Sequence, residues 1–93
     1  MSDQDNLTQQ IKNYIADYAN ISPDELNDSD HLEDDLMINL DSDLAFLIIN
    51  LVGALDLHIP SHSIKEFVNQ MQKEPEKAIF AELVAFLKEE IEF

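Results

Sequence analysis

The fold is decided by residues 41–55, which read DSDLAFLIINLVGAL. Leucine and isoleucine recur there at three- and four-residue spacing, and capping residues come first, so we predict a helix from Asp41 or Ser42 to Leu55. The opposite face of this helix is apolar too, with one asparagine as its only polar group. A helix that is apolar on nearly every side must be covered by other elements or by a partner.

The flanking sequence predicts three more helices. An apolar stripe at helical spacing indicates one over about residues 5–19, Ser61 can cap another, and Pro75 suits the first turn of a last helix over about residues 75–91. We therefore predict a single all-α domain over residues 1–93. It is a four-helix bundle, with three longer helices and a shorter or oblique third helix.

The segment between the first two long helices is polar and acidic. It opens with a capping-box signature at Ser22–Glu25 and continues as a long loop over residues 27–40. Residues 24–43 hold nine carboxylates and no Lys or Arg. Such a segment is either a solvated loop or a docking surface for Lys and Arg of another protein, with Asp34 and Asp35 as part of it. Its apolar residues predict contacts with the core at intervals: Leu26, Leu32, Leu36, Ile38 and Leu40.

Composition restricts the classes of function. The 93 residues include no cysteine, which excludes disulfides, thiolate metal sites and cysteine nucleophiles. The formal charge is −15 and there is no arginine, so nucleic acids and anionic membranes would repel the chain. No apolar run reaches the ~18 residues of a spanning helix, and the polar start does not resemble a signal peptide. We expect a monomer located in the cytoplasm.

Metal binding is not predicted. A calcium loop in the acidic segment would need a glycine at its sixth position and a glutamate at its twelfth, and these are not found in register. The histidines do not have the spacing of a zinc or catalytic cluster. We expect all three at the surface: His31, His58 and His62.

Three stretches resemble the acyl carrier protein family. Residues 21–36, ISPDELNDSDHLEDDL, are similar to the first loop of that family, with a short capped turn, a polar run, an acidic pair and a leucine. Asn39–Leu44 resembles the Gly-x-Asp-Ser-Leu box, with Asn39 in the place of the glycine and Asp43 in the place of the leucine. Leu57–Pro60 resembles the closing apolar-x-Ile-Pro motif.

This resemblance implies a carrier that catalyses nothing itself. A phosphopantetheinyl transferase would attach 4'-phosphopantetheine from coenzyme A to Ser42, flanked by Asp41 and Asp43 as recognition residues. The thiol of this arm would hold an acyl or related group as a thioester for enzymes with basic surfaces, in lipid or secondary-metabolite biosynthesis. Two alternatives remain open. In the first, Ser42 serves only as a helix cap. In the second, the chain is an unmodified acidic interaction module with the same helical bundle.

Phe46 and Ile49 lie on the outer face of the central predicted helix. We expect the long segment that follows to fold over them; if they are exposed, they dock a partner or line an acyl-chain cleft. The other aromatic residues at helical spacing are expected in the core: Tyr14, Tyr18, Phe67, Phe80 and Phe86. The expected contacts to a carried group come from the second and fourth helices: Leu47, Leu51, Phe80 and Leu83.

Overall fold

The computed structural model describes residues 3–90, with side chains from residue 6 onward. Within this range the chain forms helices and no β-strand, and one isolated bridge joins His31 to Ile79. The predicted all-α class with four helices is therefore confirmed. In chain order the elements are α1 (Asp3–Ala19), the 3-10 helix η1 (Pro23–Glu25), α2 (Leu44–Ala54), α3 (Ser61–Lys73), the 3-10 helix η2 (Pro75–Lys77) and α4 (Phe80–Glu90).

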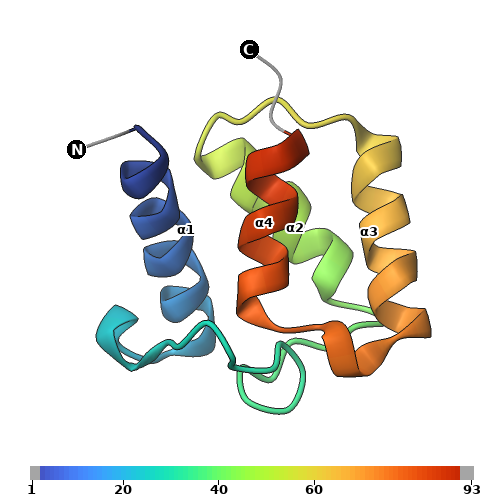
Figure 1. Cartoon of the computed structure of the whole chain (residues 1–93), viewed down its shortest axis with the longest axis horizontal. Coiled ribbons are helices and arrows are strands. Elements are labelled where there is room, and N and C mark those ends of the chain that lie inside the picture. Colours follow the sequence, from blue (N-terminus) through green and yellow to red (C-terminus); the bar gives the residue numbers. More distant parts are fainter. Residues whose placement is uncertain (1–2, 91–93) are drawn as a thin grey trace.

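The bundle is two helices deep at its centre (Figure 1). In this view α1, α4 and α3 lie side by side, and α2 passes obliquely behind α4. The molecule measures 33 × 31 × 18 Å, and its short dimension suits two layers at the usual helix spacing of about 8–10 Å. α1 begins and α4 ends at one end of the molecule, whereas α2 begins at the opposite end.

Burial of apolar stripes holds the bundle together. Each fully buried Leu, Ile or Phe side chain contributes about 1.5–3 kcal/mol to stability by leaving water. The acidic loop takes part, because all five of its predicted anchors are at most 3% exposed, as expected. The largest fully buried side chains are Phe80, Ile11, Ile15, Leu26, Leu32, Ile38, Leu44, Ile48, Leu51, Leu83 and Leu87.

Three predictions about the helices are wrong. α2 begins at Leu44, two or three residues later than predicted, because the residues before it form a separate turn. α3 has 13 residues against 11 in both α2 and α4, and the oblique helix is α2 (Figure 1), so the third helix is neither the shorter nor the oblique one. The last regular helix begins at Phe80 rather than near Pro75, because η2 and a short link come first.

Two expected caps and one core position also differ. The Ser22 side chain makes no cap hydrogen bond to η1, and the N-cap residue of α3 is Pro60, so that Ser61 is the first helical residue. Tyr18 is 47% exposed rather than buried. None of the helices within residues 3–90 has both the length and the apolar character needed to cross a membrane.

Candidate functional site

Ser42 lies in a turn immediately before α2. Its side chain is exposed, and its hydroxyl has no hydrogen-bond partner within the described part of the chain. Asp43 is the N-cap residue of α2, yet its side chain makes no cap hydrogen bond either. The interpretation of Ser42 as a helix cap is therefore wrong, because its hydroxyl satisfies no backbone group of α2.

Asn39 shapes this turn. Its side-chain Oδ1 accepts the N–H of Asp41 at 2.9 Å and the N–H of Ser42 at 3.1 Å. Its backbone carbonyl accepts the N–H of Asp43 at 2.9 Å and that of Leu44 at 3.0 Å. Asn39 thus caps the turn that precedes α2, the chemistry that the helix-cap alternative assigned to Ser42. Because the N–H groups of Asp43 and Leu44 share the Asn39 carbonyl, the regular i to i−4 hydrogen bonding of α2 begins only after this turn.

Two other elements hold the turn at Leu40. Gln72 of α3 donates from Nε2 to the Leu40 carbonyl at 3.0 Å. Glu33 of the acidic loop accepts the Leu40 N–H through Oε2 at 3.5 Å. The Leu40 side chain itself is buried, at 3% exposure. Ser42 therefore projects from a turn that is fixed by a buried side chain and by contacts from two separate segments.

The surroundings of Ser42 combine opposing electrostatic effects. The backbone N–H groups of Ala45 and Phe46, in the first turn of α2, have no backbone acceptor within residues 3–90. Such groups, with the helix dipole, favour an anion. The carboxylates of Asp41 and Asp43 on either side of Ser42 oppose it. An anion near Ser42 would therefore be attracted by the helix start and repelled by the two carboxylates.

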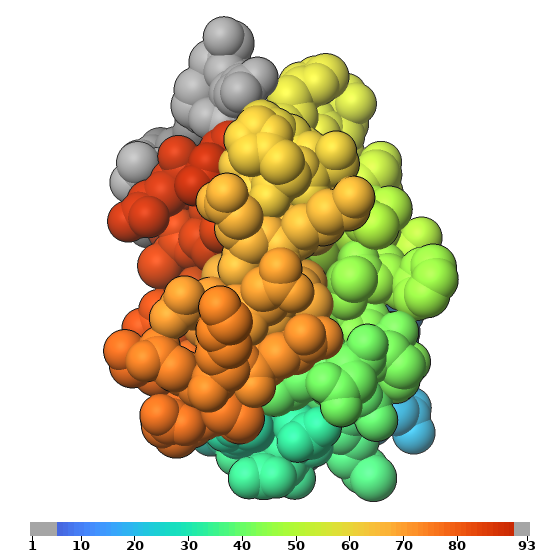
Figure 2. Space-filling view, turned by 90° about the vertical axis from the view of Figure 1, so that its right-hand side faces the viewer, coloured from blue at the N-terminus to red at the C-terminus, as the bar shows by residue number. Residues whose placement is uncertain are grey.

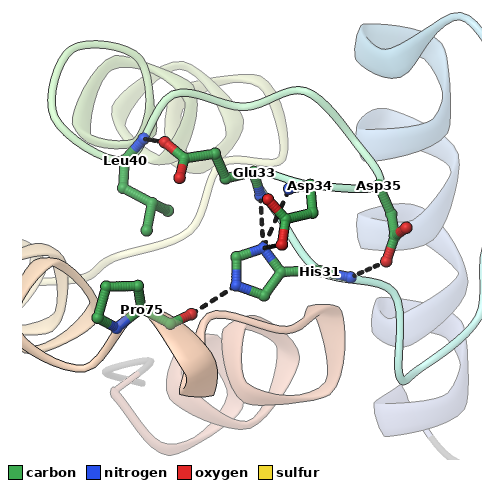
Figure 3. A network of polar contacts seen from close by, with 6 residues as sticks. All are labelled: His31, Glu33, Asp34, Asp35, Leu40 and Pro75. Carbon is green, nitrogen blue, oxygen red and sulfur yellow. Dashed lines mark hydrogen bonds and ion pairs between the residues drawn. The ribbon is translucent and has the colours of Figure 1, made fainter.

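His31 connects the acidic loop to the turn between α3 and α4 (Figure 3). Its Nδ1 accepts the backbone N–H groups of Glu33 and Asp34, each at 3.1 Å. Its Nε2 therefore carries the proton and donates to the Pro75 carbonyl. The His31 side chain is 16% exposed, and its backbone N–H donates to the Asp35 carboxylate at 2.7 Å. The surface position that we predicted for this histidine is wrong.

Backbone hydrogen bonds make the same connection. Leu32 N–H donates to the Ala78 carbonyl at 2.7 Å, and Phe80 N–H donates to the Asp30 carbonyl at 2.9 Å. Residues 30–32 of the acidic loop are therefore joined to the backbone at the start of α4. Glu74 directly precedes Pro75. Its carboxylate accepts hydrogen bonds from Lys77 and Gln70, which hold its pKa below the ordinary value.

The two predicted docking carboxylates differ in their surroundings. Asp34 is 79% exposed, and its Oδ2 lies 3.8 Å from His31 Nδ1. Asp35 is also exposed, but its carboxylate accepts the His31 N–H and so helps to fold the loop. Of the two, Asp34 is the one whose charge is available to a partner without disturbing the loop.

The expectation that Phe46 and Ile49 are covered is wrong. Phe46 is 69% exposed and Ile49 is 54% exposed. The segment after α2 does not fold over them: α3 lies beside α2 with Ile64 and Val68 toward it, and Phe67 of α3 stacks on Phe86 of α4 with ring centroids 4.3 Å apart. Figure 2 shows α3, in yellow to orange, beside the green surface of α2 and the loop before it.

An apolar groove of about 260 Å³ lies between α2 and α3. Ala45 and Ile49 line it from α2, and Ile64 and Val68 line it from α3. The four side chains expected to contact a carried group do not line it: they are core residues, each at most 2% exposed (Leu47, Leu51, Phe80 and Leu83).

Sequence reasoning missed the residues that build the site. Asn39 carried a usable signal, because asparagine is among the preferred capping residues and it comes shortly before a predicted helix. Gln72 and His31 carried none, since their partners are 32 and 44 residues away in the chain. His58 and His62 are exposed. Among residues 3–90, no three His, Asp or Glu side chains gather as a metal site would require.

The comparisons with known proteins identify no relative. No protein-family model, no curated protein and no solved structure matches the chain at a significant level.

Proposed function

We propose that this chain is a carrier protein of the acyl-carrier type, and that Ser42 bears a 4'-phosphopantetheine arm. The observation that carries the proposal is the exposed Ser42 hydroxyl, which has no partner among the described residues and stands in a fixed turn before α2. The resemblance of Asn39–Leu44 to the serine box of carriers, and of the preceding loop to the first loop of carriers, supports it.

Arm attachment is a phosphoryl transfer that needs one free hydroxyl. The Ser42 Oγ would bond to the phosphorus of coenzyme A that bears the pantetheine, and the bond from this phosphorus to the bridging oxygen would break. Adenosine 3',5'-bisphosphate leaves, and the hydroxyl proton passes to a base of the transferase. The unpaired N–H groups of Ala45 and Phe46 lie in the adjacent helix start, where they favour the new phosphodiester.

The acidic loop supports recognition by a cationic enzyme. Nine carboxylates lie in residues 24–43 without a Lys or Arg among them. Asp34 is one of the exposed carboxylates of this segment, with a side chain that is 79% exposed. A transferase with Lys and Arg around its active site would be attracted to this end of the molecule. Its cations would neutralise the negative charges of Asp41 and Asp43.

The competing function is an unmodified interaction module with the same bundle. The exposed Phe46 and Ile49 favour it, because large apolar side chains exposed next to one another on a helix indicate contact with another protein. Asn39 and Asp43, which stand where carriers have glycine and leucine, favour it as well.

Intact mass measurement separates the two functions. The protein is incubated with coenzyme A and several broad-specificity phosphopantetheinyl transferases. A carrier gains the mass of one phosphopantetheine, the Ser42→Ala variant gains none, and Ser22→Ala gains it as the wild type does. Ser22 is a matched control because it is also exposed, precedes a short helix and makes no side-chain cap. Wild type that stays unmodified with every transferase contradicts the carrier and supports the module.

A further inference from the structure

We propose that the outer face of α2 binds an amphipathic helix of another protein, which has an apolar stripe at its middle and Lys or Arg near both ends. The surface in question, here called the α2 stripe, consists of Phe46, Ile49, Asn50 and Gly53. The proposal does not require an arm on Ser42, and it holds for a carrier and for an unmodified module alike.

The α2 stripe has the spacing of a helix-packing surface. Its members stand at positions i, i+3, i+4 and i+7, so they share one face of α2 over two turns. All four residues are exposed. Facing stripes of this spacing are how two helices pack against each other. A second helix laid along α2 would bury the two largest side chains of the stripe, Phe46 and Ile49.

Gly53 leaves space for close approach. A Cβ built at Gly53 would meet nothing within 4 Å, and its φ is not positive, so neither packing nor backbone conformation in this chain requires glycine. A glycine inside a helix costs roughly 0.5–1 kcal/mol relative to alanine. The absence of a side chain there allows the backbone of a partner helix to come near.

The groove beside the stripe has the size of a side-chain pocket. Its volume of about 260 Å³ is below the roughly 300–1,000 Å³ of typical small-molecule sites. Ile49 belongs to both the stripe and the groove wall, and Ile64 and Val68 of α3 form the opposite wall. One large apolar side chain of the partner helix, such as Leu or Phe, can enter here.

The distribution of charge specifies the partner. α2 carries no charged residue; Asp43 is its N-cap residue, and Asp56 follows two residues after its last residue, Ala54. A partner that places cations near both ends of its stripe would pair with both carboxylates. A second copy of this chain would not: two chains of charge −15 repel, and an antiparallel pair of α2 helices would bring Asp43 against Asp56.

Titration with synthetic helices tests the proposal, followed by amide chemical shifts of the full chain. One peptide of about four turns has leucines along one face and lysines at both ends, and its control has glutamates at the ends. We expect the lysine peptide to shift resonances of α2 and of the groove, and to bind at least about tenfold more tightly than the glutamate peptide.

Variants show whether binding uses the stripe. Phe46→Ser and Ile49→Ser are expected to weaken binding of the lysine peptide by about tenfold or more. Gly53→Gln should weaken it too while keeping the monomer folded, because the new side chain extends into open space. Tyr18→Ser is the matched control, since it removes an exposed aromatic ring from α1 and should leave binding unchanged.

Three outcomes would overturn the proposal. The first is equal binding of the lysine and glutamate peptides, or no binding of either. The second is a set of shifted resonances confined to α1 or α4, with the stripe variants binding like the wild type. The third is a dimer in sedimentation experiments on the protein alone, with α2 resonances that move with protein concentration, which would assign the stripe to a second copy.

Discussion

Met37 holds an unfavourable backbone conformation. Its φ is 59°, in the left-handed region, and its side chain is 84% exposed, although both neighbours in the chain are buried. Its N–H donates to the Glu33 carbonyl at 3.1 Å and so ends the turn that starts at His31. The left-handed conformation costs an ordinary residue about 1–2 kcal/mol, and an exposed side chain regains little of this by burial.

Replacing Met37 by glycine should therefore stabilise the protein. We expect Met37→Gly to raise the free energy of unfolding by roughly 0.5–1 kcal/mol in urea denaturation, after the entropy that glycine adds to the unfolded chain. Met37→Ala keeps the Cβ and hence the strain, so it should not raise stability. An equal gain in both variants would show that the methionine side chain, and not the backbone conformation, is responsible.

At the turn before α2, local rules indicate which kinds of residue can cap it but do not say which residue does. The choice of Ser42 followed from a short box, whereas the capping role went to Asn39, which offers the same chemistry three residues earlier. Buried Leu40 and its contact from Gln72 fix the path of the backbone here. Asparagine is a preferred capping residue, but only the folded structure shows that Asn39 caps this turn and that Ser42 does not.

At the scale of elements, the acidic loop depends on His31. Its ring joins the loop to Pro75, and the flanking backbone joins Leu32 to Ala78 and Asp30 to Phe80. These contacts attach an otherwise irregular segment to the start of α4.

Removing the His31 ring should loosen this connection. We expect His31→Ala to lower the free energy of unfolding by about 2 kcal/mol, since several hydrogen bonds of a poorly exposed group are lost. In this variant, hydrogen exchange at the Leu32 and Phe80 amides should become faster than in the wild type, while exchange at α1 amides should change less. His58→Ala, an exposed histidine, is the control and should change neither quantity. Unchanged exchange at Leu32 and Phe80 in His31→Ala would contradict the linking role.

Helix existence was predictable, but two helix starts were not. The 3.6-residue periodicity finds α1 and α3 closely, because both carry a regular apolar stripe. α2 and α4 start later than predicted, because a separate turn precedes each of them. Asn39 forms the turn before α2, and the turn over Glu74–Lys77 precedes α4.

At the scale of the whole molecule, charge opposes compactness. The net charge is −15, and much of it lies in one loop and the turn that carries Ser42. Like charges held together on a folded surface destabilise that surface by repulsion.

Salt should therefore stabilise the isolated protein. Raising NaCl from about 0.01 to 0.1 M shortens the screening length from roughly 30 to 10 Å, and we expect Tm to rise by several °C. The double variant Asp24→Asn, Asp34→Asn should respond less, since both carboxylates are exposed. A Tm that falls with salt would contradict the repulsion and indicate stabilising ion pairs instead.

The global class follows from composition and periodicity, and the outer surface does not. One glycine, three prolines and long apolar stripes permit little except a helical bundle. Which face of α2 stays uncovered depends on how α3 packs: Phe67 stacks on Phe86 of α4, whereas Ile64 and Val68 face α2 across the groove, and Phe46 stays exposed. The sequence periodicity shows which faces of a helix are apolar, but it does not show which of two apolar faces a neighbouring helix will cover.

The start of α1 and the end of α4 lie at one end of the molecule, and the Ser42 turn precedes α2 at the other (Figure 1). A purification tag or a sensor-chip linkage that follows the start of α1 or the end of α4 would therefore attach the domain at the end opposite the start of α2. Immobilised protein can therefore be offered to soluble enzymes or peptides without masking the hydroxyl under study.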